Sequence, residues 1–136
     1  MINSENTVGT FERVDFPLLD VSDLIAKIDT GAYTGAMHCT KIEERDTADG
    51  KVVVFAPFGK HGKLHSTDDY YTKHVKSSNG LRQERFVVKT EIVIRDKTYP
   101  ILLTLADRSD MKYPVLIGRR FLRLHKLVVD ATQYKK

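Results

Sequence analysis

The chain carries the stretch Ile25-Ala26-Lys27-Ile28-Asp29-Thr30-Gly31-Ala32, in which an apolar run ends abruptly in an acid, a small hydroxyl residue and a glycine. Strands that end in this way usually turn sharply, because glycine adopts backbone angles that other residues cannot. The pattern therefore predicts a strand that delivers the Asp29 carboxylate to a fixed position at its end. Such a position suits a carboxylate that must approach a second carboxylate closely.

A second apolar stretch, which runs into a glycine and an arginine, lies near the other end of the chain: Tyr113-Pro114-Val115-Leu116-Ile117-Gly118-Arg119-Arg120-Phe121-Leu122. The two motifs in this order, each flanked by apolar strand signals, resemble the active-site loop and the strand and helix of retropepsin-like aspartic proteases. Asp-Thr-Gly alone is a match of only three residues and is often a turn that caps a strand.

The flanks of both motifs resemble one bacterial family more narrowly. Ala26 to Ala32 with Met37-His38, and Arg108 to Pro114, are similar to a family commonly labelled "ATP-dependent zinc protease" and often encoded beside a ribosomal-protein glutamate ligase. The resemblance covers residues 8 to 130 and has small or apolar departures at Gly35, Met37 and Cys39. The residues do not support the label, because the sequence has neither His-Glu-x-x-His nor a phosphate loop of the Gly-x-x-x-x-Gly-Lys-Ser/Thr type.

Length and composition indicate one globular domain, since 136 residues are too few for two ordinary ones. No apolar run approaches the length of a membrane span, and the N-terminus lacks the pattern of a signal peptide. A single cysteine, Cys39, cannot form an internal disulfide. We therefore expect a cytoplasmic protein that has no membrane partner.

The net charge of +4 is uneven along the sequence. Residues 107 to 126 contain six Lys and Arg residues against two Asp, which equals the whole formal excess. This balance suits an acidic partner. No RNA- or DNA-binding motif is present, so we expect no nucleic-acid partner.

Alternating and continuous apolar runs predict a mostly-β chain with one late helix. We expect strands over residues 8–16, 24–28, 36–43, 51–58, 85–94, 99–105, 114–118 and 127–130, a helix over 119–126 and a frayed tail over 131–136. Many short strands with turns favour a closed sheet. The resemblance implies a retropepsin-like closed β-barrel, the acid-protease fold.

Residues 59–84 differ from the rest, because three glycines punctuate a polar stretch. We expect a long loop there, and loops of that length are often functional. The resemblance implies that a β-hairpin flap closes over the substrate in this part of the chain. Whether residues 59–84 are that flap or an insertion beside it stays open.

The chemistry that the resemblance implies is peptide hydrolysis by two aspartates that share a proton. The chain contains one Asp-Thr-Gly, so a dyad requires two chains, and we expect a C2 homodimer with Asp29 facing its own copy. Gly31 would let the two loops approach and Thr30 would hydrogen-bond across the axis. Arg119, after Gly118, would support this region through an ion pair.

Three further residues complete the expected site. Ala32 lacks the hydroxyl that would hydrogen-bond an ionised carboxylate, so we expect a working pH range less acidic than that of gastric aspartic proteases. The family resemblance implies a glutamate-extended or other acidic peptide as substrate, and Arg108 and Lys112 are the candidate binding residues because arginine and lysine pair with carboxylates. We expect no metal and no cofactor.

Two other functions remain open at this point. The chain could be an inactive module that binds acidic peptides, with Asp29 as a turn residue. It could also be a zinc hydrolase using His61 and His65, whose spacing suits a metal only on a helix, which the nearby glycines disfavour. His38, Cys39 and the pair Tyr70-Tyr71 are interpreted as packing residues.

Overall fold

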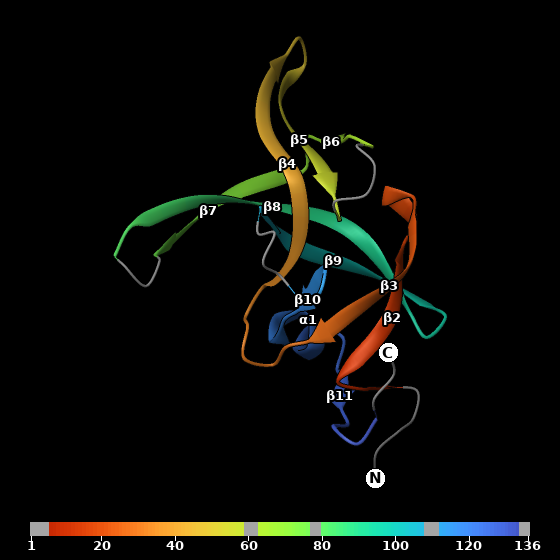
Figure 1. Ribbon diagram of the computed structural model, residues 1–136. Helices are drawn as coiled ribbons and strands as arrows, with labels where there is room; N and C mark the ends of the chain where they lie inside the picture. The colour runs from red at the N-terminus through yellow and green to blue at the C-terminus, as the bar shows by residue number, and fades with distance from the viewer. Residues whose placement is uncertain (1–5, 59–62, 77–79, 108–111, 134–136) are drawn as a thin grey trace.

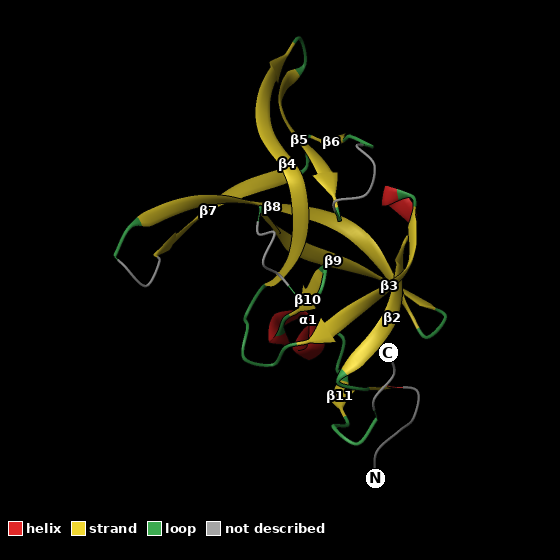
Figure 2. Ribbon diagram, in the orientation of Figure 1, coloured by secondary structure: helices red, strands yellow, loops and turns green. Residues whose placement is uncertain are grey.

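Strands account for nearly all of the regular structure in residues 6–58, 63–76, 80–107 and 112–133, which are the parts that the computed structural model describes (Figure 1 and Figure 2). In chain order the elements are β1 (Thr7–Val8), β2 (Phe11–Phe16), the 3-10 turn η2 (Pro17–Leu19), β3 (Val21–Ile28), β4 (Gly35–Thr47), β5 (Gly50–Pro57), β6 (His65–Thr67), β7 (Tyr70–Lys76), β8 (Arg82–Ile94), β9 (Lys97–Ala106), β10 (Val115–Ile117), α1 (Arg119–Leu124) and β11 (Val128–Val129).

The main sheet closes on itself as a mixed barrel. Its strands follow the order β10-β3-β2-β8-β9-β4, and β10 pairs with both ends of this row, parallel to β3 and antiparallel to β4. The three-residue strand β10 therefore closes the ring. The predicted mostly-β barrel with one short late helix is confirmed.

Period-two alternation accounts for the barrel core. Along β8, Val88, Thr90, Ile92 and Ile94 are buried on one side, as the sequence predicts. Val87, on the other side, is fully buried as well, because that side is also covered. In β10 two of the three side chains are completely buried, which fits a strand enclosed by neighbours on both edges.

The prediction of a long loop over residues 59–84 is wrong for most of the part that the structure describes. Its described parts include β6, β7 and the start of β8, and β7 pairs with β8 along its whole length as a long hairpin. Figure 1 shows this hairpin and the β4–β5 hairpin extending away from the barrel in different directions. Residues 70–84 are mostly polar and lack the regular apolar alternation from which a strand is predicted.

Several predicted boundaries also move. The strand predicted over residues 8–16 is interrupted between β1 and β2, and the strand predicted to end at residue 43 continues to Thr47. The helix ends at Leu124, which is 70% exposed and does not belong to the core. No helix among the described residues is long and apolar enough to cross a membrane.

The two ends of the described chain pair with one another. β1 and β11 form a parallel two-stranded sheet, and Gln133 accepts a hydrogen bond at its carbonyl from the Thr10 N–H at 3.0 Å. The frayed tail predicted over residues 131–136 is therefore wrong for 131–133. Residues 134–136 lie outside the described residues.

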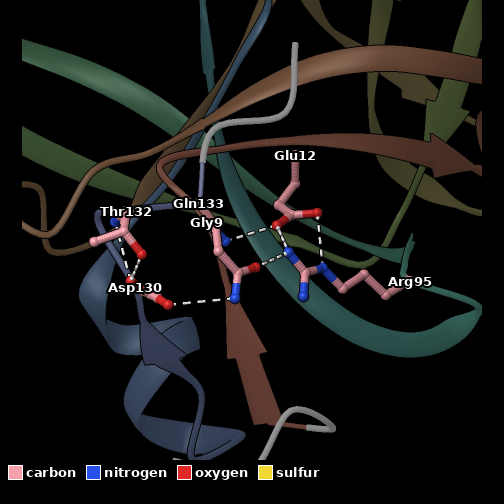
Figure 3. A network of polar contacts seen from close by, with 6 residues as sticks. All are labelled: Gly9, Glu12, Arg95, Asp130, Thr132 and Gln133. Atoms are coloured by element: carbon pink, nitrogen blue, oxygen red, sulfur yellow. Dashed lines mark hydrogen bonds and ion pairs between the residues drawn. The ribbon is translucent and has the colours of Figure 1, made fainter.

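A buried polar network holds these ends against the barrel (Figure 3). Glu12, whose side chain is 3% exposed, accepts hydrogen bonds from the Gly9 N–H at 2.6 Å and from two guanidinium nitrogens of Arg95 at 2.7 and 3.1 Å. Arg95 also donates to Gln133 Oε1 at 2.6 Å, and Gln133 donates in turn to Asp130. The network therefore joins β2, the β8–β9 turn and the C-terminal segment.

Candidate functional site

Asp29 directly follows β3, as predicted, at the edge of the barrel. Its backbone N–H donates to Ile117 O at 2.8 Å and its carbonyl accepts from the Ala32 N–H at 3.2 Å. Its carboxylate accepts a hydrogen bond at Oδ1 from the Gly31 N–H at 3.1 Å. These contacts fix a half-buried carboxylate on a loop whose next two residues, Thr30 and Gly31, are exposed.

The second motif lies directly against this loop. The Arg119 N–H donates to Ala32 O at 2.8 Å, and the Arg119 guanidinium donates to the carbonyl oxygens of Thr30 and Gly31 at 3.4 and 3.2 Å. The same guanidinium lies 5.4 Å from the centroid of the Tyr33 ring. Arg119 supports the loop as predicted, but in the described structure it does so through carbonyl oxygens and an aromatic ring rather than through an ion pair.

Two glycines permit the close approach of the motifs. A Cβ on Gly118 would lie 2.5 Å from Tyr33 O and 2.9 Å from Ala32 O, both backbone atoms that cannot swing aside. A Cβ on Gly35 would overlap Leu116 O. Gly118 belonged to the predicted site, whereas sequence reasoning noted Gly35 only as a departure from the related family.

The β7–β8 hairpin reaches the same loop. Lys73, in β7, donates from Nζ to Thr34 Oγ1 at 3.5 Å, and Thr34 precedes β4 immediately after the loop. Sequence reasoning missed this contact because it interpreted residues 59–84 as a loop, in which no register assigns Lys73 to a face. The hairpin lies in the part of the chain where the resemblance places a flap, and its role as a flap stays a prediction.

The two predicted substrate-binding cations are not brought to the loop by any described contact. Arg108 lies outside the described residues. Lys112 is exposed, its ammonium lies 5.8 Å from the centroid of the Tyr113 ring, and within the described chain no hydrogen bond or ion pair joins it to residues 29–32. Their role in binding substrate remains a prediction.

The other candidate residues occupy structural positions. Cys39 is fully buried, and burial raises the pKa of its thiol to about 12, so the thiolate required of a nucleophile is disfavoured. Tyr70 donates to Glu44 at 2.6 Å and stacks edge-on against Phe86, whereas Tyr71 is 45% exposed. His38 is half-buried in β4.

The zinc interpretation gains nothing from the described geometry. His65 lies in β6, a strand, beside the Phe55 ring, and His61 lies outside the described residues. Among the residues that are described, no cluster of three or more His, Cys, Asp or Glu side chains has an arrangement that could hold a metal ion.

Two hollows flank the Asp29 loop. A pocket of about 290 Å³ lies behind it, with a largely apolar lining contributed by Tyr33, Thr34, Gly35, Lys89, Pro100, Ile101, Leu102, Gly118, Arg120, Phe121 and Leu124. A wider, open hollow of about 620 Å³ lies beside Thr30 and is lined by Arg119, Leu122, Arg123, Lys126, Leu127, Val128 and Val129. The open hollow combines a basic rim with the apolar strand β11.

Alone, this geometry supplies one fixed carboxylate at the start of a loop that both motifs brace. A carboxylate in such a position can take a proton from a water molecule or give one to a carbonyl oxygen. A second carboxylate at hydrogen-bonding distance would allow both transfers to occur in one reaction.

Comparison with protein families gives a match over almost the whole chain. The matching family is described as RimB-like, retropepsin-like aspartic endopeptidase RimB, and the match spans residues 7–135. Both motifs and all of the strands and helices named above lie within this range.

Individual relatives agree with this result. A probable alpha-L-glutamate ligase of Desulfotalea psychrophila is 26% identical over 93% of the chain, and one of Shewanella pealeana is 28% identical over 98%. The chain spans only 28% and 30% of the length of these two relatives. The crystal structure of Lpg0085 from Legionella pneumophila, a protein of unknown function, is 27% identical and superimposes with a TM-score of 0.75, covering 96% of each chain.

Proposed function

The chain belongs to the RimB-like family of retropepsin-like aspartic endopeptidases, and from this premise we propose that it works as a C2 homodimer whose two Asp29 carboxylates together hydrolyse peptide bonds. Two carboxylates about 3 Å apart share one proton, because both cannot be ionised at that distance. The ionised partner takes a proton from a bound water as that water attacks. The protonated partner donates to the oxygen of the scissile carbonyl.

The observation that carries this proposal is the bracing of the Asp29 loop. Contacts from Ile117, Gly31 and Arg119 fix the carboxylate and its loop, yet Thr30 and Gly31 remain exposed at the surface. Rigid positioning beside an exposed backbone is what a second copy needs in order to bring its own carboxylate within hydrogen-bonding distance.

The open hollow beside Thr30 supports the same arrangement. It adjoins the loop and includes Val128, an apolar side chain that is 44% exposed. An apolar side chain exposed next to the loop is the kind of surface that an interface between subunits covers. A second copy placed there would also exclude water from the dyad.

For the substrate, we propose a peptide or protein chain extended by glutamates. The relatives named probable alpha-L-glutamate ligase carry a segment similar to this chain within a longer protein, which supports a link to glutamate additions. Arg123 and Lys126 add positive charge at the rim of the hollow beside the loop. Cations at the approach to a cleft raise the local concentration of acidic ligands.

A mixing experiment tests the shared dyad most directly. Wild type at a fixed concentration is titrated with Asp29→Asn, and hydrolysis of a fluorogenic glutamate-extended peptide is measured near neutral pH. If each site needs Asp29 from both chains and subunits exchange freely, one equivalent of Asp29→Asn halves the rate, since about half of the wild-type chains then sit in inactive heterodimers. A rate that stays constant would show that each chain works alone and would refute the shared dyad.

The same assay separates the alternatives. Chelator should leave the rate unchanged, whereas a zinc hydrolase would lose activity. If neither wild type nor Asp29→Asn cleaves but both bind the peptide equally, the chain is a binding module and Asp29 is a turn residue. Sedimentation at the assay concentration reports whether the dimer forms.

A further inference from the structure

The β7–β8 hairpin carries an unusual pair of like charges. In the antiparallel register Lys73 lies directly opposite Arg85, so both side chains project from the same face of the hairpin. Tyr71 and Val87 form the next pair on that face. Like charges placed directly opposite one another destabilise a strand pair, so this arrangement needs a compensating reason.

That face is turned toward the Asp29 loop. Lys73 Nζ contacts Thr34 Oγ1, four residues after Thr30. The opposite face carries Tyr70 and Phe86, which stack on each other and pack against the barrel core. The two faces of the hairpin are thus distinguished by the structure, and the cations lie on the face that meets the loop.

No acidic side chain neutralises the two cations within the described residues. The ion pairs found there involve neither Lys73 nor Arg85, and the guanidinium of Arg85 donates a hydrogen bond to the neutral Gln83 Oε1 at 3.3 Å. Glu84, next to Arg85 in sequence, lies opposite His74 on the other face. Both cations are half-buried, so their charge is less screened than that of fully exposed side chains.

The same face continues toward the pocket behind the loop. Lys89 follows Arg85 and Val87 at the two-residue spacing of one strand face, and it lines the 290 Å³ pocket together with Thr34 and Arg120. A row of cations therefore runs from the hairpin to an apolar pocket whose wall is the end of the catalytic loop.

We infer that Lys73 and Arg85 are specificity residues, which bind the carboxylate of an acidic side chain of the peptide away from the scissile bond. This inference rests on the proposed peptidase function and adds to it the residues that select the substrate. A carboxylate between Lys73 and Arg85 relieves their mutual repulsion, and Arg85 presents a planar fork that accepts it with two hydrogen bonds. Tyr71, which is 45% exposed, supplies surface for the methylene groups of a glutamate side chain.

The test compares two peptides that differ only in charge, one with a run of glutamates and one with glutamines in their place. Wild type should prefer the glutamate peptide in kcat/KM. The double variant Lys73→Met/Arg85→Gln should lose about tenfold of that preference, measured as the ratio of kcat/KM on the two peptides, which is the sum of two modest charge contacts. A third peptide has lysines in place of the glutamates. The variant Lys73→Glu/Arg85→Glu should have a higher kcat/KM on this lysine peptide than on the glutamate peptide.

Two matched controls separate recognition from structure. Arg82→Glu changes a charge on the same hairpin but on the opposite face, since Arg82 shares its face with Glu84 and Phe86, and it should leave the glutamate preference intact. Thr34→Val removes the Lys73 contact but keeps the cation. If Lys73 has a purely structural role, Thr34→Val and Lys73→Met should lower kcat/KM equally for both peptides and leave the preference unchanged. That result would overturn the inference.

Binding to Asp29→Asn distinguishes failure of the inference from failure of the proposed peptidase function. In one outcome, wild type cleaves neither peptide, but Asp29→Asn binds the glutamate peptide more tightly than the glutamine peptide. If adding Lys73→Met/Arg85→Gln then abolishes this difference in affinity, the two cations recognise glutamate although the chain is not a peptidase. If wild type cleaves with a preference that Lys73→Met/Arg85→Gln leaves unchanged, the peptidase stands and the inference is refuted.

Discussion

The ion pair between Glu12 and Arg95 offers the sharpest test of what holds the barrel and the chain ends together. Arg95 and Asp96 form the β8–β9 turn, and both have a positive φ, 50° and 67°, which non-glycine residues adopt at a cost. Glycine at either position relieves that cost. Only Arg95→Gly also leaves the buried Glu12 carboxylate without its partner.

The two changes should therefore differ greatly in effect. Breaking a buried ion pair costs about 3–5 kcal/mol, and we take the lower end because the Arg95 side chain is 30% exposed. Glycine at a position of positive φ removes backbone strain and so stabilises the folded state by about 1 kcal/mol. Glycine also loses more conformational entropy on folding, and this loss offsets most of that gain. We expect Arg95→Gly to lose about 2–3 kcal/mol, or about 7–10 °C in Tm, and Asp96→Gly to stay within about 0.5 kcal/mol of wild type.

Urea unfolding followed by circular dichroism measures both values, with the slope checked for a two-state transition. In the Arg95→Gly background, adding Glu12→Gln should recover part of the loss, because it removes the uncompensated charge while keeping an acceptor for the Gly9 N–H. Equal destabilisation by Arg95→Gly and Asp96→Gly would show that the turn, and not the ion pair, determines the effect.

Three further predictions follow from other contacts. Gly118→Ala should destabilise the protein by about 2–3 kcal/mol in the same urea assay, because its Cβ would meet Tyr33 O at 2.5 Å although its φ of −88° suits any residue. Arg119→Lys should fold normally but lower kcat on the glutamate peptide about tenfold, because lysine lacks the planar fork that braces the loop; an unchanged kcat would contradict that bracing. Hydrogen bonds from Thr132 hold the pKa of Asp130 below its usual 3.8. The Asp130 carboxylate therefore stabilises the fold above that pH, and this contribution is lost as the pH falls through the lowered pKa. Asp130→Asn should be less stable than wild type at neutral pH and should lose less stability than wild type between about pH 5 and pH 2.

The sequence was sufficient to predict the barrel and the ends of the two strands that carry the motifs. The apolar runs that end in Asp29 and in Gly118 are local signals, and local signals predict where each strand ends. The structure brings Ala32 and Arg119 into contact as the paired motifs implied.

The hairpin β7–β8 and the chain ends could not be predicted in the same way. Residues 70–84 lack the apolar alternation that predicts a strand, so Lys73 had no assigned face and its position opposite Arg85 could not be predicted. The hydrogen bond from Thr10 to Gln133 joins residues more than a hundred positions apart in the sequence, and no local pattern encodes it. Gly35 offered a signal, because glycine within a strand often marks a close backbone approach.

The closure of the barrel by β10 has a consequence for the order in which the protein folds. This three-residue strand joins β3 and β4, which belong to the first third of the chain, so its contacts carry a large loop-closure cost and form late. The N–H of Asp29 donates to the carbonyl of Ile117, in that strand. During synthesis, the loop bearing Asp29 therefore acquires its final shape only after Ile117 has left the ribosome. If the proposed dyad is correct, a nascent chain has no fixed Asp29 loop to contribute to it before that point.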